Sequence, residues 1–139
     1  MAGGEFSLKL RVYIEDTDAG GIVYYVNYLK FMERARTEFM RSLGYGKDYI
    51  FNHDLMFVVR DVGVKYLRPA TLDDELEATV SVRCARGAVM ILRQSVRRGE
   101  EILAQGDVTI ACVERSVLKP RRLPPEMVAR LQTLQQEQK

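Results

Sequence analysis

The sequence is poor in the residues that metal centres and histidine-dependent triads require. It has one histidine, His53, and two cysteines, Cys84 and Cys112, which lie far apart and outside any CxxC pair. This set does not make a zinc cluster. No Gly-x-Ser-x-Gly segment is present, so a Ser-His-Asp triad is poorly supported. We expect no metal and no cofactor, a loop position for His53, and two reduced thiols in a cytoplasmic protein.

The chain also lacks long apolar runs and an excess of charge of either sign. No apolar run approaches the roughly 20 residues that span a bilayer, and the first nine residues do not resemble a signal peptide. The 21 basic and 19 acidic residues leave a formal net charge of +2, which is too balanced to indicate nucleic-acid binding. With 139 residues, 47% of them apolar, we expect one globular domain over residues 1–139.

The N-terminal part of the chain predicts a strand, a loop and a long helix. Apolar residues occupy every second position from residue 6 to residue 14, which is typical of a strand. Residues 16–21 contain two aspartates and two glycines, which favour a loop. From about residue 26 to residue 43, apolar residues recur at spacings of three and four, which predicts an amphipathic helix. Gly44 is well placed to end it.

The rest of the chain is predicted to be rich in strands. Residues 45–54 are aromatic and without a clear period, so we expect irregular structure there. Four segments with β-branched or alternating apolar residues predict strands, at residues 55–67, 75–83, 88–97 and 102–114. Residues 98–100 indicate a hairpin turn between the last two. Two prolines followed by a narrow apolar stripe predict a C-terminal helix at about residues 124–138.

This order of elements predicts an α+β fold. The long helix must bury its apolar stripe, and a curved antiparallel sheet of about five strands wrapped around it would do so. Such a sheet has two edge strands, and an edge presents unpaired backbone groups to a second chain. We therefore expect a homo-oligomer.

Several segments are specific in combination and resemble a known family. They are the loop sequence Asp-Thr-Asp18-Ala-Gly-Gly, the helix sequence Glu33-Arg-Ala-Arg36, the sequence Tyr66-Leu-Arg-Pro-Ala70 and the sequence Lys119-Pro-Arg-Arg-Leu-Pro124. The resemblance extends over nearly the whole chain. The chain resembles the hotdog-fold acyl-CoA thioesterases of the 4-hydroxybenzoyl-CoA thioesterase and YbgC group.

The resemblance implies a hotdog fold, dimers that commonly pair into tetramers, and an active site at the dimer interface near the start of the long helix. It implies that Asp18 is the catalytic carboxylate and that the backbone N–H of Tyr25 polarises the acyl oxygen. Many YbgC proteins have a histidine where this chain has Tyr25, and the 4-hydroxybenzoyl-CoA thioesterase has a tyrosine. The backbone N–H is present with either side chain, whereas a role for an imidazole at this position is excluded.

These residue types suit thioester hydrolysis. A carboxylate can activate water as a general base, or attack the acyl carbon to form a mixed anhydride, and the sequence leaves both routes open. The first amides of a helix have no internal acceptors and can stabilise negative charge on an acyl oxygen. Asp16, in the same loop, is predicted to be mainly a turn former.

Coenzyme A carries several phosphates, so its site needs positive charge. The candidate substrate-binding residues are Gly21, Tyr24, Arg60, Gly63, Arg68, Lys119, Arg121 and Arg122. Gly63 either allows close approach of the acyl chain or relieves crowding between strands. Glu33 and Arg36 are either exposed helix charges or residues near the subunit interface.

Two functions of different class follow. The first is an acyl-CoA thioesterase that releases a free acid and coenzyme A. The second is a non-catalytic acyl-binding or scaffold protein with the same fold, for which the resemblance suggests partners of the bacterial Tol–Pal envelope system. The acyl chain length, its aromatic or aliphatic character, and the choice between coenzyme A and acyl-carrier protein stay open at this point.

Overall fold

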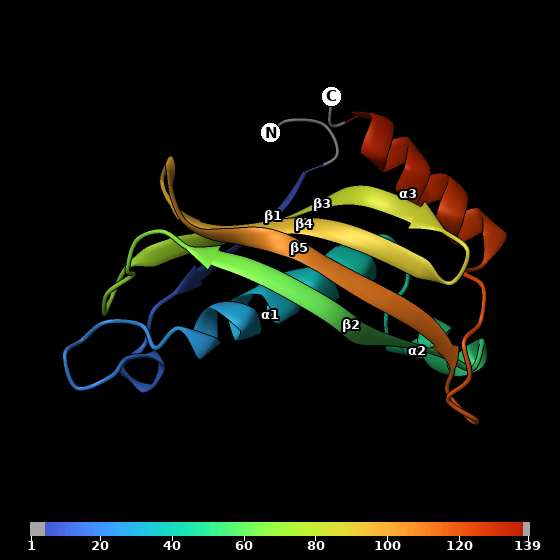
Figure 1. Ribbon diagram of the computed structural model, residues 1–139, viewed down its shortest axis with the longest axis horizontal. Coiled ribbons are helices and arrows are strands. Elements are labelled where there is room, and N and C mark those ends of the chain that lie inside the picture. The colour runs from blue at the N-terminus through green and yellow to red at the C-terminus, as the bar shows by residue number, and fades with distance from the viewer. Residues whose placement is uncertain (1–4, 138–139) are drawn as a thin grey trace.

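The computed structural model describes residues 5–137 and places one long helix under a curved, five-stranded antiparallel sheet (Figure 1). The strands lie side by side in the order β1 (Phe6–Arg11), β3 (Glu75–Arg86), β4 (Val89–Arg98), β5 (Glu101–Glu114) and β2 (Leu55–Tyr66). The helices are α1 (Val26–Ser42), α2 (Lys47–Asn52) and α3 (Pro125–Glu137), with the short 3-10 helix η1 (Ile14–Asp16) before α1. The predicted α+β arrangement of a helix and a curved sheet is confirmed.

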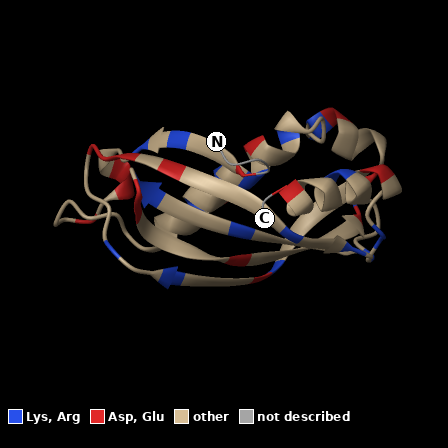
Figure 2. Cartoon of the chain, turned by 90° about the horizontal axis from the view of Figure 1, so that it is seen from above, with Lys and Arg blue, Asp and Glu red and all other residues tan. Residues whose placement is uncertain are grey.

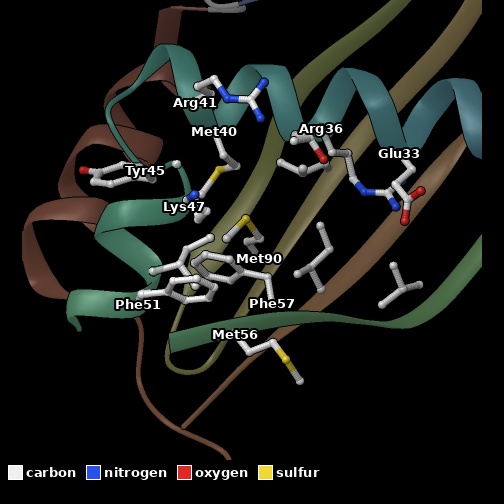
Figure 3. Close-up of a pocket in the computed structure, with 16 residues that line it drawn as sticks. Glu33, Arg36, Met40, Arg41, Tyr45, Lys47, Phe51, Met56, Phe57 and Met90 are labelled. Carbon is white, nitrogen blue, oxygen red and sulfur yellow. The ribbon is translucent and has the colours of Figure 1, made fainter. Parts of the chain in front are cut away.

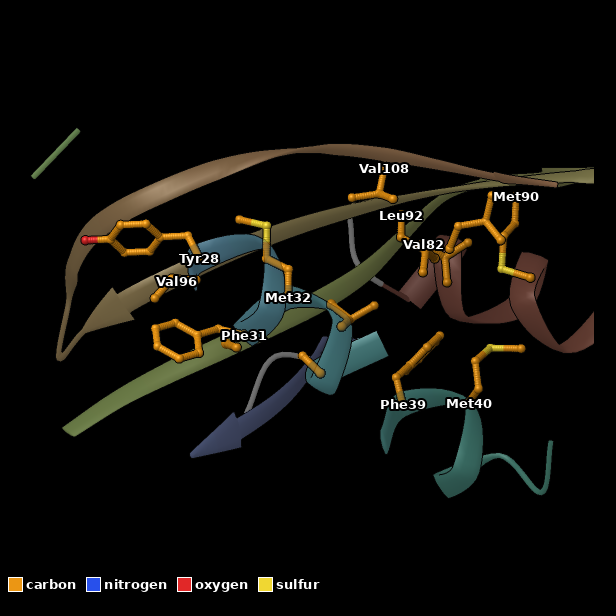
Figure 4. Close-up of a cluster of buried hydrophobic side chains, with 14 of the residues drawn as sticks. Tyr28, Phe31, Met32, Phe39, Met40, Val82, Met90, Leu92, Val96 and Val108 are labelled. Atoms are coloured by element: carbon orange, nitrogen blue, oxygen red, sulfur yellow. The ribbon is translucent and has the colours of Figure 1, made fainter. Parts of the chain in front are cut away.

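The core forms where α1 meets the concave face of the sheet (Figure 4). The predicted helix stripe is buried at Tyr28, Met32, Ala35 and Phe39, and the structure adds Phe31 and Met40 to it. The facing stripes of the sheet are also buried, at Leu76, Ala78, Val80, Val82, Met90, Leu92, Val96 and Val108. Because each large apolar side chain contributes about 1.5–3 kcal/mol when buried, this contact fixes α1 against the sheet.

The first strand is shorter than the predicted range of residues 6–14. It ends at Arg11, and Ile14 lies in η1 with 76% of its surface exposed. The carboxylate of Asp16 accepts a hydrogen bond from the N–H of Tyr13 at 2.9 Å. Short polar side chains compete with strand pairing in this way, so the local turn overrides the alternation of apolar residues.

The expectation of irregular structure at residues 45–54 was wrong, because α2 occupies Lys47–Asn52. Six residues are too few for a helical period to be visible in the sequence. Gly44 and Gly46 flank the turn between α1 and α2, and Gly44 has the positive φ of 94° that glycine adopts without strain. The predicted C-terminal helix is confirmed over Pro125–Glu137, and residue 138 lies outside the described residues.

The two edges of the sheet differ. β1 pairs with the first half of β3, from Glu75 to Val80, and α3 covers the remainder. The side-chain amides of Gln132 and Gln135 donate to the carbonyls of Ala85 and Arg83 in β3, at 3.0 and 2.5 Å. β2 forms the opposite edge, and its exposed residues include Val59 and Val62. A long edge strand with exposed apolar side chains is a ready site for pairing with another chain.

An ion-pair network at the hairpin between β4 and β5 stabilises the start of β3. Asp74 accepts hydrogen bonds from the N–H of Thr71 at 2.8 Å and from Nη1 of Arg98 at 2.6 Å, and Arg98 also pairs with Glu101. Burial alone would raise the pKa of Asp74, but the bonds from Thr71 and Arg98 outweigh it and lower that pKa.

Asp74→Asn is therefore expected to destabilise the protein by about 1 kcal/mol at pH 7, in the range of partly exposed charged hydrogen bonds. A folded pKa below the unfolded value means that the carboxylate stabilises the fold above about pH 4. That stabilisation is lost as the pH falls through the folded pKa. Urea unfolding measures the free energy of unfolding of both proteins at pH 7 and pH 3. The difference between wild type and variant should be smaller at pH 3. Glu100→Gln, at an exposed turn residue, is the control, and an equal difference at both pH values would contradict the expectation.

Candidate active site

The loop before α1 is a hairpin bound to the segment that follows β2. Within the hairpin, the N–H of Asp18 donates to the carbonyl of Ile22 at 2.9 Å. Ala70 accepts from the N–H of Val23 at 2.9 Å, and the N–H of Leu72 donates to the carbonyl of Gly21 at 3.0 Å. Two sequence motifs about 50 residues apart are thus hydrogen-bonded neighbours at the start of the helix.

Asp18 lies at the tip of this hairpin with its side chain exposed in the single chain. Its Oδ1 accepts hydrogen bonds from the N–H groups of Gly20 at 2.8 Å and of Ile22 at 3.4 Å. These bonds fix the orientation of the carboxylate. Gly21 has a φ of +78°, so its first role in the structure is to allow the turn. Asp16 supplies bonds within the loop, as the sequence predicted.

The first turn of α1 presents open backbone donors. The N–H groups of Asn27 and Tyr28 donate back to the carbonyls of Tyr24 and Tyr25, at 2.8 and 3.2 Å. Among residues 5–137, the structure gives the amides of Tyr25 and Val26 no hydrogen-bond acceptor. The side chain of Asn27 donates to the carbonyl of Asp16 at 2.7 Å and so ties the loop to the helix. This helix end can stabilise an anionic oxygen through its amides.

An aromatic cluster lies beside these amides. The rings of Tyr24 and Tyr25 are 5.0 Å apart, and the ring of Tyr66, at the end of β2, lies 5.7 Å from Tyr25 and 5.6 Å from Tyr28. The buried hydroxyl of Tyr28 accepts from the N–H of Ala70 at 2.9 Å, and burial raises the pKa of Tyr28. Tyr66 was not among the predicted site residues, although it begins the Tyr-Leu-Arg-Pro-Ala sequence.

Four of the five predicted basic residues fall into two groups at opposite ends of β2. Arg68 lies at the Asp18 end, where its Nε pairs with Glu101 at 3.2 Å. The other end of β2 holds Lys119, Arg121 and Arg122. There the N–H of Arg121 donates to the carbonyl of Cys112, and the guanidinium of Arg121 donates to the carbonyl of His53, just before β2. The 12 residues of β2 span roughly 36–40 Å at about 3.3 Å per residue. One chain therefore does not bring these three residues to Asp18.

Arg60 and Gly63 lie on the exposed edge strand. Arg60 is the extra residue of a β-bulge, because Val59 pairs with Ile110 and Asp61 with Thr109. A Cβ added to Gly63 would have no heavy atom within 4 Å. The crowding between strands falls instead on Gly106 of β5, where an added Cβ would lie 1.9 Å from the carbonyl oxygen of Gly63. Sequence reasoning missed Gly106, for which a lone glycine in a strand pattern was the available signal.

A cavity of about 480 Å³ opens between α1, α2 and β2 (Figure 3). Most of its lining is apolar and includes Met40, Phe57 and Met90, while Glu33 and Arg36 lie together on its wall. The guanidinium of Arg36 donates to Gln94 at 3.0 Å, and burial lowers the pKa of Arg36. Gln94 is fully buried and donates in turn to the carbonyl of Met32 at 2.9 Å. The cavity thus combines an apolar body with a fixed polar wall.

Charged residues of both signs are interspersed over the strands and helices in the view of Figure 2. Within the described part of the chain, no three His, Cys, Asp or Glu side chains gather as a metal site would require. Cys84 and Cys112 are free thiols, and burial raises the pKa of Cys112. Each helix within residues 5–137 is too short or too polar to span a bilayer.

Comparison with known proteins identifies the family and the fold. The family model of the thioesterase-like superfamily matches residues 12–131. The chain belongs to this superfamily, and its fold is the hotdog fold of thioesterases. A probable thioesterase from Bartonella henselae superposes with a TM-score of 0.81 at 35% identity, covering 86% of this chain and 99% of that one.

The similarity to particular relatives extends over nearly the whole chain. The acyl-CoA thioesterase YbgC of Haemophilus influenzae is 39% identical over 130 residues, which are 93% of this chain and 96% of the relative. The acyl-CoA thioester hydrolase YbgC of Escherichia coli O157:H7 is 40% identical over 125 residues, or 89% and 93% of the two chains. The resemblance to the YbgC group is therefore confirmed.

Proposed function

We propose that this protein is an acyl-CoA thioesterase in which Asp18 and the amide of Tyr25 act on the thioester. The observation that supports this most directly is that one hydrogen-bonded unit holds the exposed carboxylate and the open amides at the start of α1. Two YbgC relatives of at least 39% identity are named for acyl-CoA thioester hydrolysis.

In the proposed reaction, Asp18 takes a proton from water while the water oxygen attacks the acyl carbon. The acyl oxygen becomes an oxyanion and is stabilised by the amide of Tyr25. The carbon–sulfur bond then breaks, the free acid is released, and the thiolate of coenzyme A recovers the proton. A direct attack by Asp18, with hydrolysis of the mixed anhydride, is the second route; we favour the general base.

A second copy of the chain would complete the site. β2 is an exposed edge strand, and pairing two β2 strands about a two-fold axis would make them antiparallel. The Leu55 end of one strand would then lie beside the Tyr66 end of the other. This arrangement brings Lys119, Arg121 and Arg122 of one copy towards Asp18 of the other, where basic side chains could bind the phosphates of coenzyme A.

The same pairing would give the acyl group a place. The cavity between α1 and α2 lies at the Leu55 half of β2, so it would face the Asp18 hairpin of the second copy. Its apolar lining suits an acyl chain. We therefore assign the acyl group to this cavity and the functional unit to a dimer, which could pair further into a tetramer.

Filling the cavity should alter the choice of acyl chain. Thr37 lines the cavity from α1 and is exposed, so Thr37→Phe adds a ring without removing a core side chain. We expect kcat/KM for long acyl groups to fall about tenfold or more, and that for acetyl-CoA to change little. Steady-state kinetics over acyl groups of increasing length measure this. Arg34→Phe places the same ring outside the cavity lining as a control, and equal effects of both variants would contradict the assignment.

A thiol-release assay over short, long and aromatic acyl-CoA substrates tests the proposed function itself. Turnover of at least one class of acyl-CoA supports the proposed function. The same assay with acyl-carrier protein thioesters identifies the carrier. Acyl-CoA binding in calorimetry without turnover of any substrate would overturn it in favour of the acyl-binding scaffold. In that case a pull-down with Tol–Pal components would be the next experiment. Because the proposed substrate is a coenzyme A thioester, we also propose that the protein acts in the cytoplasm.

A further inference from the structure

The ring of Tyr66 lies against the first turn of α1. Its centroid is 5.7 Å from that of Tyr25, with an interplanar angle of 80°, and 5.6 Å from that of Tyr28, with an angle of 55°. Tyr28 is buried and anchored through its hydroxyl to the N–H of Ala70, four residues after Tyr66. Tyr66 thus joins the fixed part of the helix to Tyr25, the residue at the helix start.

The side chain of Tyr25 has few other contacts. Its side chain is 55% exposed, and its other ring contact is to Tyr24, which is 51% exposed. The backbone beside it is held at the helix start, because the carbonyls of Tyr24 and Tyr25 accept from the N–H groups of Asn27 and Tyr28 at 2.8 and 3.2 Å, while the Tyr25 amide itself has no acceptor among residues 5–137. The edge-to-face contact with Tyr66 is therefore the ring contact that joins the Tyr25 side chain to the end of β2.

We propose that Tyr66 is a positioning residue whose ring holds the amide of Tyr25 where the oxyanion forms. This inference depends on the proposed thioesterase function. The contact is made by the ring, since the structure gives the hydroxyl of Tyr66 no hydrogen-bond partner among the described residues. Burial and the neighbouring hydroxyls of Tyr25 and Tyr28 raise the pKa of Tyr66, so its hydroxyl stays protonated at neutral pH.

The kinetic consequence follows from the geometry of oxyanion stabilisation. Such donors act when they lie within about 0.5 Å of the required position. An amide that contacts the oxyanion in the transition state raises kcat and has a small effect on substrate binding. Loss of the Tyr66 ring should lower kcat about 10- to 100-fold and leave KM within about twofold.

The experiment compares Tyr66→Phe, Tyr66→Leu and the neighbouring control Leu67→Ala, each with an acyl-CoA that the wild type hydrolyses. Tyr66→Phe keeps the ring and should retain kcat, whereas Tyr66→Leu should lose it. Leu67 is similarly exposed at the same end of β2 and has no aromatic ring, so Leu67→Ala should resemble the wild type. Circular dichroism and light scattering establish that fold and oligomeric state are retained.

Tyr25→Leu removes the other half of the contact and keeps the backbone amide. It should lower kcat as Tyr66→Leu does, and the double variant should lose no more than either single one. This pair tests the contact even where Tyr66→Leu fails to fold. Equal losses in Tyr66→Phe and Tyr66→Leu, a loss confined to KM, or additive losses would overturn the positioning role. A wild type without turnover would instead overturn the proposed function of the whole site.

Discussion

Asp18→Asn should reduce acyl-CoA hydrolysis by about 1000-fold and leave the fold intact. A positioned general base contributes about 10²–10⁴-fold, and an amide cannot accept the proton from water at neutral pH. The substitution keeps an oxygen that can accept the hydrogen bonds from Gly20 and Ile22, so the hairpin should keep its shape. The measurement is kcat from thiol release, with thermal unfolding and light scattering on the same samples.

Asp16→Asn is the matched control for this experiment. Asp16 lies two residues away in the same loop, and its carboxylate accepts the N–H of Tyr13. The backbone carbonyl of Asp16 accepts hydrogen bonds from the side chain of Asn27 and the N–H of Tyr24, and the substitution leaves this carbonyl in place. We expect less than a fivefold change in kcat. Unaltered turnover in Asp18→Asn, or an equal loss in both variants, would contradict the assignment of the carboxylate.

Gly106→Ala should destabilise the protein by about 3 kcal/mol, the upper part of the usual range for overpacking. The added Cβ would lie 1.9 Å from the carbonyl oxygen of Gly63, 2.8 Å from its carbonyl carbon and 2.9 Å from the Cα of Val64. All three are backbone atoms, so no side chain can rotate away, and β2 must move relative to β5. The measurement is the urea midpoint of unfolding at fixed protein concentration.

Gly63→Ala is the matched control, because it makes the same change in the neighbouring strand. Its Cβ would have no heavy atom within 4 Å of it, and Gly63 is not among the glycines with positive φ. We expect its stability to lie within about 0.5 kcal/mol of the wild type. Similar unfolding midpoints for the two variants would mean that the close approach of the strands does not constrain Gly106.

The long helix and the strands were predictable because the periodic pattern of apolar residues in each extends over enough positions to be distinguished from chance spacing. The stripe from Tyr28 to Phe39 and the alternation from Leu76 to Val82 are both buried, as expected. Where the prediction failed, the segments were short. Ile14 is exposed because Asp16 closes a local turn, and α2 has only six residues.

Part of the candidate site could also be predicted from the sequence. The sequence and its resemblance to a family pointed to Asp18 and Tyr25, which the structure finds in one loop and the helix start that follows it. Tyr66 was missed because its importance arises from ring contacts with residues about 40 positions earlier. Gly106 was missed because its constraint is a backbone atom of another strand.

By itself, the sequence determined the helix, the strands and the chemical character of the Asp18 hairpin, since these depend on spacing within short stretches of chain. The tertiary structure alone decided which residues meet. It placed the segment from Tyr66 to Leu72 against the hairpin, left β2 as an open edge, and separated Arg121 from Asp18 by the length of a strand. Such distances depend on how a sheet orders its strands, and a periodic pattern in one segment contains no information about its neighbours in space.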